Sequence, residues 1–177
     1  VHSVSVNKGV VNQIEHLGRS YAAKDISNYK LVKPGDLIYT KSPTGGYPYG
    51  IIKQSKINYP AIVSPLYGVF TPENFNLGSI LDIYFESQNN TARYLKPLIH
   101  KGAKNTMNIT NTTFLSGSLL LPTDFREQES ISNLFSTINS DIDKWSKKLS
   151  LFEDQKNHLL NNLIIGQIRV PEFANKN

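Results

Sequence analysis

Cysteine is absent from the 177 residues, and methionine and tryptophan occur once each. Without cysteine the chain has no disulfide bonds and no thiolate metal ligands, so the reducing cytoplasm is the compartment that we expect. No apolar run approaches the roughly 20 residues that span a bilayer, and the first residues carry no signal-peptide pattern. The composition therefore predicts a cytoplasmic protein without membrane partners. Because the chain opens at Val1 and its only methionine is Met107, we also expect a longer parent chain.

Acidic residues are scarce in the first two thirds of the sequence. Residues 1–122 hold 12 Lys and Arg against 6 Asp and Glu, a net charge of +6, whereas residues 123–177 hold 7 against 8, a net charge of −1. A basic excess confined to one segment is what a phosphate-binding surface requires. Many basic domains are merely kept soluble by such charge, so the charge alone leaves both interpretations open.

Residues 1–122 read as short strands separated by turn signals, the pattern of a compact β-rich domain of the α+β class. The strand candidates are residues 37–39, after the turn-forming Pro34-Gly35-Asp36, and residues 61–63, 68–70, 80–85 and 119–121. All nine tyrosines lie before residue 95.

Glycine and proline are missing from residues 124–165, where apolar residues recur in alternating steps of four and three. This seam consists of Ile131, Phe135, Ile138, Ile142, Trp145, Leu149, Phe152, Leu159 and Leu163, with Lys156 at the heptad position between Phe152 and Leu159. The pattern predicts one long coiled-coil helix over residues 123–165, capped by Thr123 or Asp124 and ended by Gly166. Residues 166–177 form a C-terminal tail.

A helix packed on its own domain would also be apolar along one face. A single straight seam of more than four heptads is more typical of a helix that projects and pairs, and we favour that interpretation. From Ile131 to Leu163 such a helix rises roughly 48 Å at about 1.5 Å per residue. That rise equals about fourteen base pairs of DNA, so the helix suits the role of a spacer between two DNA-reading modules.

Recognisable catalytic motifs are lacking. The histidines have no metal-binding spacing, and the glycine-rich residues 45–50 lack the Lys-Ser/Thr of a phosphate loop. Asn58-Tyr59-Pro60 departs at its second residue from the Asn-Pro-Pro-aromatic box of adenine methyltransferases. These features favour a binding protein without cofactor or metal over an enzyme.

Three stretches interleave basic and amide side chains with tyrosine, around residues 19–24, 39–49 and 100–108. Lys and Arg bind phosphates, and small polar side chains read base edges in the major groove. Any single residue among them could instead be a solvated loop side chain or a half-buried core tyrosine with no contact to DNA. The DNA-binding candidates are Arg19, Tyr21, Lys24, Lys41, Ser42, Thr44, Tyr47, Tyr49, Lys101, Lys104 and Asn105.

Several segments together resemble the specificity subunit of type I restriction–modification enzymes. Residues 5–42, with Lys8-Gly9-Val10, residues 25–30, Val32 and residues 35–39, look like the start of a target-recognition domain, and residues 62–70 resemble its central strand motif. The most specific match is Leu121-Pro122, Glu127-Gln128 and Ile131 followed by the heptads with Leu151, Lys156 and Leu159-Leu160, which resembles the conserved spacer helix. Pro171-Glu172-Phe173 is similar to the motif that often closes these chains.

The resemblance implies a non-catalytic subunit that reads one half of a bipartite site in double-stranded DNA. It implies methyltransferase subunits as partners, restriction subunits recruited through them, and antiparallel pairing of the helix with a second recognition half or with itself. Family members carry two recognition domains and two spacers, whereas this sequence resembles one of each, as in the C-terminal half of a longer subunit or in a natural half-subunit. Two rivals remain: a non-catalytic coiled-coil scaffold whose β domain binds protein or carbohydrate, and, more remotely, an enzyme.

Overall fold

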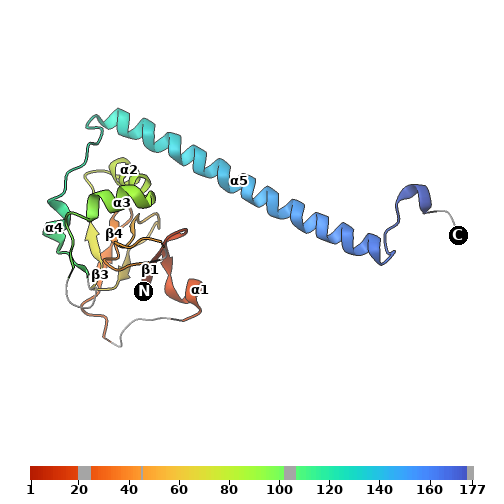
Figure 1. Ribbon diagram of the computed structural model, residues 1–177, viewed down its shortest axis with the longest axis horizontal. Coiled ribbons are helices and arrows are strands. Elements are labelled where there is room, and N and C mark those ends of the chain that lie inside the picture. The colour runs from red at the N-terminus through yellow and green to blue at the C-terminus, as the bar shows by residue number, and fades with distance from the viewer. Residues whose placement is uncertain (20–24, 45, 102–106, 175–177) are drawn as a thin grey trace. The chain divides into compact units, whose positions relative to one another are not determined.

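The computed structural model describes residues 1–19, 25–44, 46–101 and 107–174, and it has the expected α+β architecture (Figure 1). The chain divides into two compact units, Val1–Ser132 and Asn133–Asn177. The first is a β-rich domain with short helices, and it includes the first two turns of a long helix. The second consists of the rest of that helix and the C-terminal tail.

The first sheet of the domain has the strand order β2-β1-β6-β3. Its strands are β1 (His2–Ser5), β2 (Gly9–Asn12), β3 (Lys30–Val32) and β6 (Ala61–Val63), and the short helix α1 (Gln13–Leu17) follows β2. β1 runs antiparallel to β2 and parallel to β6, and β3 pairs antiparallel with β6. One face of this sheet buries Val10, Val32 and Val63.

The second sheet, of order β5-β4-β7, is the middle layer of the domain. Its strands are β4 (Leu37–Tyr39), β5 (Ile52–Gln54) and β7 (Gly68–Phe70). Ile38 of β4 packs with the valines of the first sheet, while its neighbours Leu37 and Tyr39 pack on the opposite side against the helical layer. Because alternate residues of a strand face opposite sides, β4 joins both cores and is fully buried.

Helices α2 (Phe75–Glu86), α3 (Gln88–Leu95) and α4 (Asn111–Leu115) form the third layer (Figure 1). Phe85, Leu95 and Phe114 meet the second sheet there, and Phe114 stacks on Phe70 with ring centroids 4.5 Å apart. The short strands β8 (His100–Lys101) and β9 (Met107–Asn108) pair with each other between α3 and α4.

Two expected strands are wrong. Residues 80–85 belong to α2, whose apolar side chains follow the spacing of a helix and whose first turn is capped by the Asn74 side chain, 2.9 Å from the amide of Leu77. Residues 119–121 form no strand, and Leu120 is fully exposed. A run of three leucines before a proline has no period that separates a strand from an extended connection.

The long helix α5 (Phe125–Ile164) comprises 40 residues, close to the expected limits of 123 and 165. Its Asp124 cap is confirmed, because the carboxylate accepts from the amide of Glu127 at 3.0 Å. Gly166 ends the helix with a φ of 72°, and the 3-10 turn η2 (Pro171–Phe173) follows. In the described part of the chain no helix combines the length and apolar character needed to cross a membrane.

The first turns of α5 are fastened to the domain by Gln128. Its side chain is buried, donates to the carbonyl of Pro122 at 2.8 Å and accepts from the Asn74 amide at 2.9 Å. Asn74 therefore caps α2 and holds α5 with the two ends of one amide group.

Candidate nucleic-acid interface

The loop between β4 and β5 contains most of the second predicted DNA-binding stretch. Hydrogen bonds between Thr40 and Ile51 join the two ends of this loop, which we call its neck. The amide of Thr40 donates to the carbonyl of Ile51 at 3.0 Å, and the amide of Ile51 donates to the Thr40 hydroxyl at 3.0 Å. Thr40 and Ile51 are both buried. The loop is thus a continuation of the hairpin and has a defined base.

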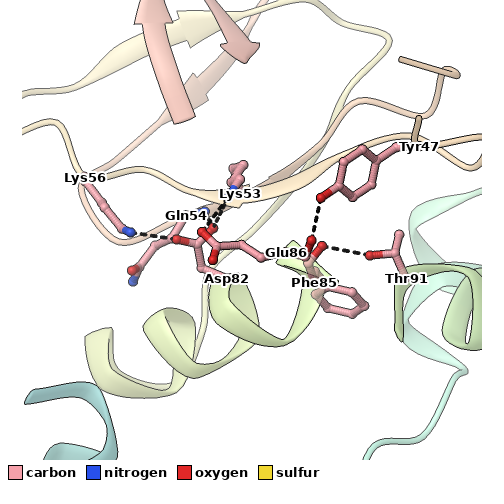
Figure 2. A network of polar contacts seen from close by, with 8 residues as sticks. All are labelled: Tyr47, Lys53, Gln54, Lys56, Asp82, Phe85, Glu86 and Thr91. Carbon is pink, nitrogen blue, oxygen red and sulfur yellow. Dashed lines mark hydrogen bonds and ion pairs between the residues drawn. The ribbon is translucent and has the colours of Figure 1, made fainter. Parts of the chain in front are cut away.

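The hydroxyl groups of two tyrosines, Tyr39 and Tyr47, anchor the loop through hydrogen bonds to backbone carbonyls. Tyr39 donates to the carbonyl of Tyr49 at 2.7 Å, and burial raises the pKa of the Tyr39 hydroxyl, which therefore stays protonated as a donor. Tyr47 is 8% exposed and donates to the carbonyl of Glu86 at 2.5 Å (Figure 2). The structure therefore places Tyr47 in the interior and Tyr49 half-buried against the core, as anchors of the loop.

The backbone of the loop relies on left-handed conformations. Gly50 has a φ of 89°, and a Cβ there would lie 2.9 Å from the Tyr39 ring. Lys41 has a φ of 54°, the sole left-handed non-glycine residue of the described chain. Such a conformation costs a lysine about 1 kcal/mol and persists where surrounding contacts impose it.

The remaining candidates of this loop face outward. Ser42 and Thr44 are exposed. Lys41 is half-buried, and its ammonium group donates to the side-chain oxygen of Asn111 at 2.7 Å. In its described residues the loop thus presents two exposed hydroxyls next to one half-buried cation.

The other two predicted stretches are described only in part. Arg19 is exposed, whereas Tyr21 and Lys24 lie outside the described residues. Lys101 ends strand β8, but its side chain is outside the described part, as are Lys104 and Asn105.

Lys30 and Asn111 are polar residues close to Lys41 that the sequence did not single out as contacts. Lys30 stands on β3, and Asn111 begins α4, 70 residues after Lys41. Tyr29 precedes Lys30, but this pair lies outside the three predicted stretches, and Asn111 has no adjacent aromatic or basic residue. The pairing of β3 with β6 and of β4 with β7 brings together segments that are distant in the sequence.

A second group of polar residues, shown in Figure 2, braces α2 against the edge strand β5. Asp82 is almost fully buried, and its carboxylate lies 2.8 Å from the ammonium of Lys56 and 3.8 Å from that of Lys53. It also accepts from the amide of Gln54 at 3.2 Å. Lys53 binds Glu86 at 2.8 Å as well. The backbone amide of Gln54 on edge strand β5 thus has a hydrogen-bond acceptor, and the charges of Lys53 and Lys56 are neutralised within the fold.

The seam of α5 is exposed along its length from Phe135 to Leu163. Trp145, at its middle, is 67% exposed. The Lys148 ammonium lies 5.1 Å from the centroid of Trp145 and 5.6 Å from that of Phe152, a cation–π arrangement. The face that the heptads mark is therefore available to a partner helix.

No group of three or more His, Asp or Glu side chains is placed to hold a metal ion among the described residues. In comparisons with known proteins, no family model, curated protein or solved structure matches this chain.

Proposed function

We propose that this chain is the sequence-specific DNA-recognition module of a type I restriction–modification system, acting in the cytoplasm and catalysing nothing itself. Residues 1–122 read one half of a bipartite target in double-stranded DNA. The helix sets the spacing to a second recognition half and takes part in recruiting methyltransferase subunits, which in turn bind restriction subunits. Adenine methylation and ATP-driven cleavage are carried out by those partners.

The observation that carries the proposal is the pinned loop between β4 and β5. Ser42 and Thr44 are exposed beside Lys41, and the loop is held at Tyr47, Tyr49 and its neck. A loop ordered before binding loses little conformational entropy when it meets DNA, and hydroxyls next to a cation suit base edges next to a phosphate. The net charge of +6 over residues 1–122 also supports binding to DNA.

The long helix supports a paired assembly. In an antiparallel pair centred on Lys147, Trp145 of one helix would lie level with Leu149 of the other, and Lys156 level with Ile138. In a parallel, in-register pair, Lys156 would instead face its own copy, and two like charges in a seam are unfavourable. The seam therefore favours an antiparallel arrangement, with two recognition domains at opposite ends of the spacer.

Salt-dependent binding to duplex DNA tests the proposal. We expect fluorescence anisotropy to show binding of the full chain to a duplex at 50 mM salt, with affinity falling at least about 100-fold by 200 mM if four or more phosphates are contacted. An unlabelled single-stranded competitor of equal charge should displace the duplex poorly. A chain that ignores the duplex at low ionic strength would contradict the proposal.

The scaffold hypothesis draws on the same seam, because heptads predict pairing whether or not the domain binds DNA. Under that hypothesis the domain binds protein or carbohydrate. Stable dimerisation together with no duplex affinity at low salt would favour it.

A further inference from the structure

Two lysine side chains, one from strand β3 and one from the loop after β4, approach the start of β7. The ammonium of Lys30, on β3, donates to the carbonyl of Tyr67 at 2.5 Å. The ammonium of Lys41 donates to the side-chain oxygen of Asn111 at 2.7 Å, and that oxygen lies 3.2 Å from the Cβ position of Gly68, the residue after Tyr67. The peptide segment at residues 67–68 is thus approached by both cations.

Both lysines have uncharged hydrogen-bond acceptors. Their acceptors, a backbone carbonyl and an amide oxygen, carry no charge, and neither lysine forms an ion pair within the described ranges of the chain. Asp82 and Glu86 form their ion pairs with Lys53 and Lys56 instead.

The surroundings of Lys41 disfavour its charged form. Burial lowers the pKa of Lys41, and the charge of Lys30 lowers it further. Each ammonium group has three donor hydrogens and uses one on the Tyr67 carbonyl or the Asn111 side chain, which leaves two for another acceptor. A half-buried cation, in a left-handed backbone conformation and next to a like charge, has to be held there by the fold.

We propose that Lys30 and Lys41 form a phosphate-binding site, with Tyr67 and Asn111 as the neutral acceptors that orient the two ammonium groups. One phosphate oxygen on each ammonium completes the site through charge-assisted hydrogen bonds. The inference rests on the proposed function, because it takes the phosphate to be part of a DNA backbone. The site would then fix the position of the neighbouring Ser42 and Thr44 along the duplex. Lys41 is then a backbone-positioning residue, and the exposed hydroxyls are the ones that face bases.

Binding of inorganic phosphate to the full chain tests the site without DNA. In proton–nitrogen spectra of the lysine ammonium groups, we expect the signals of Lys30 and Lys41 to shift together with one apparent Kd. Lys96, an exposed lysine of the helical layer, is the internal control. Shifts at Lys30 and Lys41 no larger than that of Lys96 would overturn the site.

Duplex binding tests the source of the phosphate with the double variant Lys30→Gln/Lys41→Asn. Glutamine can still donate to the Tyr67 carbonyl, and asparagine tolerates a left-handed φ, so both changes remove charge with little cost to the backbone. The slope of log K against log salt should become shallower by about 1.8, or about 0.9 for each lost phosphate contact. Lys41→Arg should retain the wild-type slope.

The matched control is Arg93→Gln/Lys96→Gln, which removes two exposed charges from the end of α3 and should leave the slope unchanged. Equal slopes for wild type and Lys30→Gln/Lys41→Asn would overturn the site and leave the proposed function standing. A wild-type chain without duplex affinity would overturn the proposed function, and the phosphate titration would then decide the site alone.

Discussion

Asp82 is the buried one of the two carboxylates, Asp82 and Glu86, that brace α2 against β5. Its side chain is 2% exposed and that of Lys53 is 9% exposed, whereas that of Lys56 is 57% exposed. Asp82→Asn leaves a buried ammonium with Glu86 alone, so we expect the free energy of unfolding to fall by about 3 kcal/mol. Lys56→Ala removes the exposed half of the same network and should cost under about 1 kcal/mol. Urea titration with an unchanged m-value measures both, and equal costs would contradict the brace.

His2 supplies a pH-dependent contribution to stability. The residue is buried, its ring lies 3.2 Å from the Tyr59 hydroxyl, and burial lowers its pKa from 6.5, with the positive amino terminus lowering it further. The unfolded chain then binds a proton near pH 6.5 while the folded chain resists protonation. The stability contributed by His2 is present above that pH and is lost as pH falls below it.

We therefore expect the free energy of unfolding to decline as the pH drops from 7 to 5, and the decline to be smaller in His2→Gln. His16→Gln, at an exposed histidine, is the control and should behave as the wild type does. Denaturant titrations at several pH values measure the difference. Parallel curves for wild type and His2→Gln would count against this role for His2.

Residue roles at the candidate interface were only partly predictable from sequence. The stretch from Tyr39 to Tyr49 was singled out for its mixture of tyrosine and small polar residues, and the structure divides it into buried anchors and exposed Ser42 and Thr44. Spacing along a chain carries no information on which side of a hairpin loop is buried. Lys30 and Asn111 escaped notice because their proximity to Lys41 comes from strand pairing across long sequence distances.

At the scale of elements, the exposed seam of α5 predicts self-association of the full chain. Leu149 lies on the seam and is 59% exposed, whereas Leu151 lies off the seam and is 68% exposed. In a twofold dimer the interface would bury Leu149 of both helices, so Leu149→Ser removes two buried leucines. At about 1.5 kcal/mol or more for each copy, we expect the Kd of the dimer to rise at least about 100-fold. Leu151→Ser removes the same side chain from outside the interface and should leave the Kd unchanged.

Sedimentation equilibrium measures both variants against the wild type. A wild-type chain that stays monomeric at high micromolar concentration would refute the dimer. Equal weakening by the two substitutions would show that the seam is not the contact surface.

The elements were predictable where one period was sustained. The limits of α5 were anticipated within two residues at each end, because residues 124–165 lack glycine and proline and keep one heptad phase. Residues 37–39, 61–63 and 68–70 are strands as expected, since turn residues bound each short apolar run. Residues 80–85 were misread because six residues are too few to distinguish loose alternation from the helical spacing that α2 follows.

For the complete assembly, we propose that a basic recognition domain is joined to a helix that pairs antiparallel with a second copy. Two identical domains related by a twofold axis must read two identical half-sites of opposite orientation. The target of this chain alone is therefore expected to be an inverted repeat with a fixed spacing, and a second, different recognition half would make the target asymmetric.

Selection of the full chain on randomised duplexes, followed by sequencing, would reveal such an inverted repeat. The account predicts enrichment of one short motif, present as two inverted copies at a single spacing, with Leu149→Ser enriching the motif only as single copies. Repeated rounds that enrich no sequence over the starting pool, with the protein folded and dimeric, would contradict it.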